Sequence, residues 1–158
     1  RADVAEAVGT AAIRYADLSQ NPQSNVTFTW DKVLSLEGNT APYLMYSLAR
    51  CRSIQRKSEE PPSLAAIGAK GPFERALMMH LLRFGDVVSV AAGVYRPNLL
   101  CDYLYEAANV FNRFYREERV LGADTAEDRS RRLALVEATA AVLERGFGLL
   151  GIRPLARM

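Results

Sequence analysis

Two tyrosines and two cations recur on one side of a short segment, and their chemistry suits a flat or anionic ligand. Tyr43, Tyr46, Arg50 and Lys57 lie in the stretch YLMYSLARCRSIQRK. On a helix with about 100° per residue, these four side chains fall within about 60° of one another. Bases stack on tyrosine rings, and arginine contacts phosphates or base edges. The pattern is therefore typical of a surface that binds single-stranded nucleic acid.

A purely structural interpretation explains the same spacing equally well. Tyrosines that cap a hydrophobic core and hydrogen-bond locally recur at these intervals too, so spacing alone leaves both interpretations open. A second stripe, Leu44, Leu48 and Cys51, lies about a quarter-turn away and predicts the face that packs on the rest of the protein.

The charge distribution favours the binding interpretation. The net charge of +2 arises locally, since residues 41–57 hold four cations and no acid, residues 1–40 carry −2, and residues 58–158 are balanced. A basic stripe attracts polyanions, of which nucleic acid is the commonest. The alternative is a solvated helix end, because cations also favour the last turn of a helix.

The elements that must position this stripe are almost all helical. The chain is long enough for one domain with a proper core. VTFTW (26–30) alternates β-branched and aromatic residues and predicts one short strand, followed by a turn of helix. Thr40 is the expected N-cap of the tyrosine-bearing helix. The sequence predicts an all-α, antiparallel helical bundle with one short extended segment near its N-terminal end. Helices are expected at 2–16, 41–57, 72–84 and 86–94, then from Pro97 and from Thr125, with Gly151 ending the last.

The other residues that could carry chemistry have simpler structural explanations. The one histidine, His80, lies in an apolar helix and is expected to be packed, and Cys51 and Cys101 are expected to be free buried thiols. No phosphate-loop, nucleophile-elbow or dinucleotide motif occurs. Individual apolar runs such as 87–95 are too short to span a bilayer. Because the chain opens at Arg1 without a leader pattern, we expect an excised piece with no signal peptide.

Several segments resemble the arginyl-tRNA synthetases. They are RYADLSQN (14–21), FTWDKVLSLEGNTAPYLMYSLARCRSI (28–54), YLYEAANVFNRFY (103–115), VLGAD (120–124) and RLALVEATAAVLERGFGLLGI (132–152), with RM at 157–158. The resemblance covers nearly the whole chain in order and is weakest at 58–96. It is to the C-terminal, DALR-type anticodon-binding domain.

This resemblance implies recognition of the anticodon stem-loop of tRNA-Arg. The family's anticodon-contacting tyrosines and arginine correspond to Tyr43, Tyr46 and Arg50, and its deforming loop corresponds to 35–40. The terminal methionine, Met158, corresponds to another contact, so the chain end is expected to be the native one. The expected RNA-binding set also includes Asn39 and Lys57. Residues 1–30 are expected to connect to a preceding catalytic domain, and 31–158 to form the anticodon-binding domain.

The catalytic half of that family is not recognisable in this sequence. A single histidine excludes a His-x-Gly-His signature, and no Lys-Met-Ser occurs. We therefore expect no catalysis and no cofactor in this chain, ATP and Mg in the parent catalytic domain, a cytoplasmic location, and no membrane or DNA partner. Two alternatives stay open: a helical protein-interaction module that has lost RNA binding, and the related domain of cysteinyl-tRNA synthetase.

Overall fold

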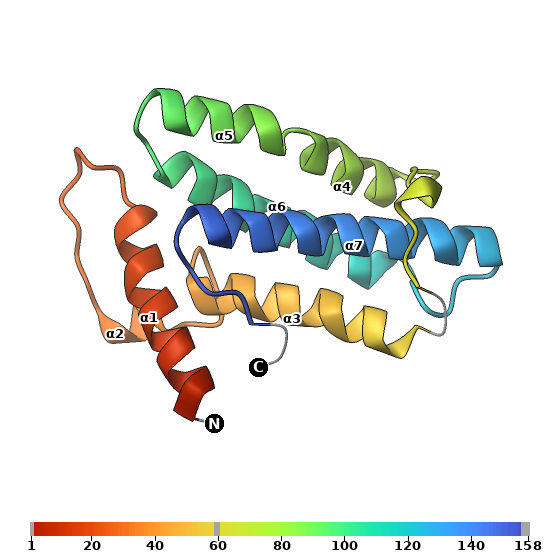
Figure 1. Cartoon of the computed structure of the whole chain (residues 1–158), viewed down its shortest axis with the longest axis horizontal. Coiled ribbons are helices and arrows are strands. Elements are labelled where there is room, and N and C mark those ends of the chain that lie inside the picture. Colours follow the sequence, from red (N-terminus) through yellow and green to blue (C-terminus); the bar gives the residue numbers. More distant parts are fainter. Residues whose placement is uncertain (1, 59–60, 156–158) are drawn as a thin grey trace.

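A computed structural model describes residues 2–58 and 61–155, and within these ranges the regular structure is helical (Figure 1). The all-α prediction is confirmed. The helices, in chain order, are α1 (Ala2–Leu18), α2 (Trp30–Val33), α3 (Ala41–Lys57), the 3-10 turn η1 (Leu64–Ala66), α4 (Pro72–Leu82), α5 (Phe84–Gly93), α6 (Asn98–Glu117) and α7 (Ala126–Leu149).

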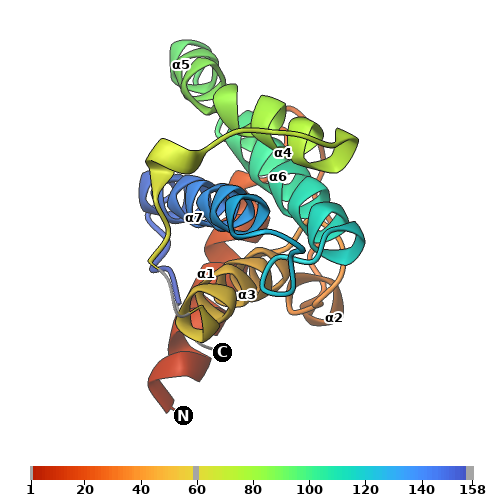
Figure 2. The same cartoon turned by 90° about the vertical axis from the view of Figure 1, so that its right-hand side faces the viewer.

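The long helix α7 lies at the centre of the bundle. It contacts α3 on one side and α6 and α4 on the other, and Figure 2 shows it between these layers. Its direction is opposite to that of α3 and α6 (Figure 1). As a result α3 and α6 run the same way, and residues that follow one another on α3 meet successive residues on α6. This register matters for the site described below.

The apolar stripes predicted from the sequence form the core. Leu44, Leu48 and Cys51 of α3 are fully buried, as are the corresponding large side chains of α6 and α7. Helices α6 and α7 approach so closely that a Cβ at Gly146 would collide with the side chain of Leu104. The apolar face of α1 adds Tyr15, which is also fully buried.

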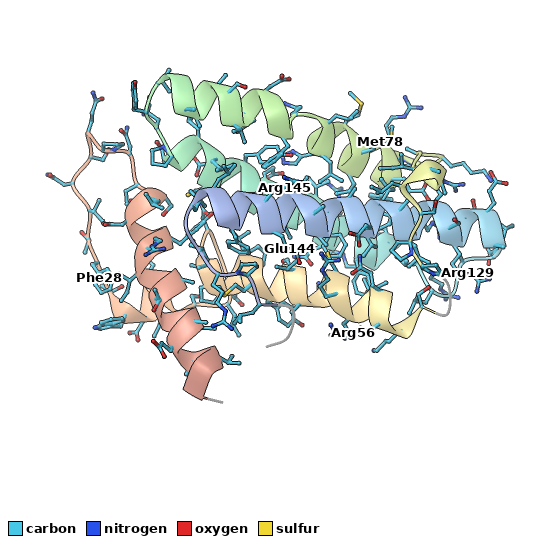
Figure 3. The ribbon with its side chains drawn as sticks, in the orientation of Figure 1. Phe28, Arg56, Met78, Arg129, Glu144 and Arg145 are labelled. Atoms are coloured by element: carbon cyan, nitrogen blue, oxygen red, sulfur yellow. The ribbon has the colours of Figure 1, made fainter. Side chains whose placement is uncertain are left out.

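The predicted strand at 26–30 is wrong. Residues 25–29 have no regular structure, and Trp30 begins α2. A strand needs a neighbouring strand to pair its backbone groups, and the described part of the chain offers none. The alternating side chains Val26, Phe28 and Trp30 remain about half exposed, and Phe28 lies on the outer edge of this segment (Figure 3).

The boundary between α4 and α5 also differs from the prediction. The first helix was expected to run through Phe84, with Gly85 as the break, but the break falls at Arg83, where φ is −80° and ψ is −4°. Gly85 lies instead in the first turn of α5, where the backbone is ordinary helix. Other predicted ends are confirmed, since Thr40 and Thr125 cap their helices by accepting from the amides of Tyr43 and Asp128.

Together α4 and α5 form an apolar stretch with a consequence for membrane assignment. Taken as one segment, Pro72–Gly93 is long and apolar enough to cross a membrane by length and composition alone. The separate runs in the sequence fall short of this length. A single stretch of this kind is weak evidence for a span, and both helices pack along α6 in this fold.

An ion-pair network fixes α4 against α7. Glu74 is 1% exposed, and its carboxylate accepts from Nε of Arg131 at 3.0 Å and Nε of Arg132 at 2.8 Å. Arg132 extends the network to the loop after α6, where it meets Glu118 at 2.6 Å and the carbonyl of Arg119 at 2.8 Å. This network fixes that loop relative to the bundle.

Candidate nucleic-acid interface

The loop 35–40 is closed by its own polar side chains before α3 begins. Thr40 Oγ1 donates to the carbonyl of Ser35 at 2.7 Å and accepts from the amide of Tyr43 at 3.3 Å. Gly38 has φ +79°, a left-handed conformation that glycine adopts without strain. These contacts set the direction in which the chain enters α3.

Asn39 anchors this loop to two other helices. Its Oδ1 accepts from the hydroxyl of Tyr15 at 2.6 Å, and its Nδ2 donates to Oδ1 of Asp102 at 3.0 Å. The Tyr15 hydroxyl also lies 2.9 Å from the carbonyl of Cys101, and burial raises the pKa of this tyrosine far above its ordinary value. Both ends of the Asn39 amide are therefore engaged, and each keeps one further hydrogen-bonding position, the second hydrogen on Nδ2 and the second lone pair on Oδ1.

Tyr43 lies partly inside the bundle. Its hydroxyl donates to Oδ1 of Asn109 at 2.7 Å and accepts from Nδ2 of Asn112 at 3.0 Å. Its ring meets Tyr105 edge-on, with centroids 5.7 Å apart. The side chain is thus held between α3 and α6 by its ring and its hydroxyl.

Tyr46 is exposed on the stripe, and Arg50, which is half-buried, lies beside it. The Tyr46 side chain is 47% exposed, and the Arg50 guanidinium lies 4.8 Å from the centre of its ring. Arg50 also donates from Nη1 to Oδ1 of Asn112 at 2.6 Å and from Nη2 to the Tyr46 hydroxyl at 3.1 Å. These contacts hold the guanidinium in place beside a ring that is open to solvent.

Tyr115 extends this arrangement from α6, and the sequence analysis missed it. Its ring centre lies 5.3 Å from the Arg50 guanidinium, and it is 41% exposed. The Tyr115 ring stacks on Phe111, with centroids 6.2 Å apart. The sequence could have indicated that these two residues share a helix face, because they are one helical turn apart. What the sequence did not show is the parallel register of α3 and α6, which brings Tyr115 to Arg50.

Arg52 does not belong to an unbalanced basic face of α3. It forms salt bridges across the bundle to α7, with Glu137 at 3.0 Å and Glu144 at 2.5 Å. Figure 3 shows Glu144 between the two helices. The hydrogen bonding of the Arg52 guanidinium to the Glu144 carboxylate is the main cause that raises the pKa of Arg52. One of the four cations of 41–57 is therefore balanced within the fold, by acids distant in sequence.

Two predicted site residues remain, one at the end of α3 and one outside the described residues. Lys57 is exposed in the last turn and lines a pocket that Arg50 also lines. Met158 lies outside the described residues. Elsewhere, His80 is packed as expected, because its ring stacks on Tyr103 at 4.5 Å between centroids. Cys51 and Cys101 are free and buried. Among the described residues no three potential metal ligands cluster.

Residues 44–158, well over half of the chain, match the DALR anticodon binding domain. The chain belongs to this family. Of the predicted site, Tyr46, Arg50, Lys57 and Met158 lie within the matched part of the DALR domain, Tyr43 immediately precedes it, and Asn39 lies in the loop before it.

Related proteins match the sequence of this chain along nearly its full length. An arginine–tRNA ligase of Chloroflexus aurantiacus is 44% identical over 162 residues, covering 100% of this chain and 28% of the relative. One from Synechococcus sp. WH7803 is 47% identical over 156 residues, covering 98% of this chain and 26% of the relative. The chain thus spans little more than a quarter of these proteins. Because these matches are to arginine–tRNA ligases, the cysteinyl alternative is not favoured.

Solved structures show the same DALR fold. The arginyl-tRNA synthetase of Thermus thermophilus matches with a TM-score of 0.89 and 34% identity, covering 99% of this chain and 27% of that chain. That of Plasmodium falciparum matches with a TM-score of 0.88 and 28% identity, covering 99% and 28%.

Proposed function

We propose that this chain recognises the anticodon stem-loop of tRNA-Arg through the exposed face of α3, as part of an arginine–tRNA ligase. The observation that carries the proposal is the Tyr46–Arg50–Tyr115 arrangement. A guanidinium held between two half-exposed rings offers both a stacking surface and a fixed charge. Aromatic rings and arginine planes are the groups on which unpaired RNA bases stack.

We propose a different RNA contact for each residue of this interface, according to its position. Tyr46 receives a base, Arg50 contacts a base edge or a phosphate, and Lys57 contacts the backbone. Tyr43 supports this surface from the α3–α6 interface, with its ring edge within reach of a neighbouring base. Asn39 joins the interface when the loop 35–40 adjusts to the RNA. We also assign Met158 to the interface, on the family resemblance alone.

The parent protein joins arginine to tRNA-Arg with ATP and Mg in a separate catalytic domain, and this chain contributes no catalytic group or cofactor. Residues 1–30 connect the two domains, and the catalytic domain is the intramolecular partner. The parent acts in the cytoplasm, with tRNA rather than DNA or a membrane as its partner. Support for this assignment comes from the arginine–tRNA ligases that match along the full chain.

A binding measurement with matched RNAs tests the proposal. The chain is titrated with the tRNA-Arg anticodon stem-loop and with a stem-loop of equal length that carries an unrelated anticodon. We expect tighter binding to the first, and a smaller preference in an Arg50→Gln variant. Equal affinity for both RNAs would refute anticodon recognition. Absence of binding to either would favour the protein-interaction module.

A further inference from the structure

A pocket of about 410 Å³ opens directly beside Arg50, where the ends of α3 and α6 meet the loop after α6. Four cations line it: Arg50, Lys57, Arg116 and Arg119. Lys57, Arg116 and Arg119 are exposed. The pair of Arg116 with Glu117 at 3.4 Å lies at the surface, where such pairs contribute little and are readily exchanged for another anion.

Among the described residues that line this pocket there is one carboxylate, and it is balanced from outside the pocket. Glu118 lies 2.6 Å from Nη2 of Arg132, which is not itself part of the lining. Nη1 of the same arginine donates to the carbonyl of Arg119, and its Nε is held by the buried Glu74. Arg132 therefore neutralises Glu118 and fixes the loop that carries Arg119.

We propose that this pocket binds the phosphodiester backbone of the RNA strand next to the base stacked on Tyr46, with Arg116 and Arg119 as phosphate contacts. The inference rests on the proposed function, because it gives that RNA a direction across the surface. Arg50 and Tyr115 belong to both the pocket and the aromatic arrangement, so a strand reaches from one to the other without a gap. Arg132 is a positioning residue that keeps the pocket cationic.

The salt dependence of binding tests the two arginines. Each phosphate contact to a single strand contributes about 0.7 to the slope of log affinity against log salt. We expect Arg116→Gln/Arg119→Gln to reduce this slope by about 1.4, which lowers the affinity ratio between 50 and 200 mM salt about 7-fold. The preference between the two anticodon stem-loops should stay unchanged, because phosphates carry no sequence information.

A matched pair of exposed arginines provides the control. Arg83 and Arg145 are exposed and do not line the pocket, so Arg83→Gln/Arg145→Gln removes the same charge elsewhere. An equal change of slope in both double variants would overturn the pocket, because it would show only a general charge effect. An unchanged slope in Arg116→Gln/Arg119→Gln would overturn it as well.

A rescue experiment tests Arg132. Arg132→Gln should weaken binding because the Glu118 carboxylate is then left unbalanced at the pocket, and Arg132→Gln/Glu118→Gln should restore it. The second substitution cannot restore the lost bond to Glu74, so recovered affinity per folded molecule reports electrostatics rather than stability. No recovery would refute the positioning role.

The two proposals fail in different ways. If the unaltered chain does not distinguish the stem-loops but the slope changes as expected, the anticodon assignment is wrong and the phosphate pocket stands. If the stem-loops are distinguished while the slope does not change, the pocket is wrong and the anticodon assignment stands.

Discussion

The hydroxyl of Tyr43 has two asparagine partners, whereas the ring of Tyr46 has a guanidinium beside it and solvent around it. Two tyrosines that look equivalent by spacing thus differ in environment. Tyr43 has the local hydrogen bonds of a structural side chain, and Tyr46 has the exposure of a binding side chain. Substitutions at the two positions should therefore affect different measurements.

Tyr46→Ala should cost about 1–3 kcal/mol of binding to the tRNA-Arg anticodon stem-loop, through loss of a stacking surface. The melting temperature should change little, because alanine favours helix and the buried stripe is untouched. Affinity and melting temperature are measured on one sample. Tyr95, 89% exposed after α5, supplies the matched control Tyr95→Ala. Loss of stability without loss of affinity would contradict the binding role.

Tyr43→Phe should have the complementary effect. The change leaves Oδ1 of Asn109 without its donor and Nδ2 of Asn112 with only Ser47 Oγ as acceptor, at 3.1 Å. We expect a loss of about 1 kcal/mol in the free energy of unfolding by denaturant titration. RNA affinity per folded molecule should stay within error, since the ring remains. A large affinity loss at unchanged stability would show that the hydroxyl contacts RNA.

At the scale of elements, α4 is fastened to α7 by a carboxylate that must stay ionised. Burial by itself raises the pKa of Glu74, but hydrogen bonds from Arg132, the Lys70 amide and Arg131 outweigh it and hold this pKa below its ordinary value. Asp128 follows the same rule, with its pKa lowered to about 2 mainly by Arg131. Both groups thus favour the folded state above their unfolded pKa values, and this contribution is lost as the pH falls through the folded ones.

We therefore expect the melting temperature to fall steadily between about pH 5 and pH 2. Glu74→Gln should lower the free energy of unfolding at neutral pH by about 1.5–3 kcal/mol, because Arg131 and Arg132 lose the buried carboxylate they share and keep only Asp128 and Glu118 as charge partners. Between pH 5 and pH 2 the melting temperature of this variant should fall less than that of the unaltered chain. Glu117→Gln, at an exposed carboxylate, should change neither quantity. Parallel pH profiles for the Glu74 variant and the unaltered chain would contradict this account.

Sequence periodicity predicted the long helices well because their stripes are regular and their caps are local. Thr40 and Gly151 act on neighbouring residues, so their roles are readable from sequence. The strand at 26–30 failed for the opposite reason, since strand formation depends on a partner elsewhere in the chain. Tyr115 and the acids that balance Arg52 were missed for the same reason: both depend on which helices lie side by side.

At the scale of the whole molecule, the DALR bundle is built as one body around α7. We predict that the chain is folded and mostly helical in isolation, and that it shows no arginine-dependent exchange between ATP and pyrophosphate. The catalytic signatures of arginyl-tRNA synthetases are not recognisable in its sequence. Circular dichroism and an exchange assay on a clean preparation check both statements. Exchange activity that rises in proportion to the amount of this chain would refute the second.

The reactivity of the two buried thiols, Cys51 and Cys101, reports local unfolding of this bundle. Burial is the main cause that raises the pKa of both, and for Cys101 the pKa rises to about 12. Neither thiol is exposed, so an alkylating reagent modifies each only when its helix opens. Cys51 reports on α3 and Cys101 on the start of α6, near the anchored Asn39. Alkylation rates with and without RNA would therefore show, helix by helix, which part of the interface becomes rigid on binding.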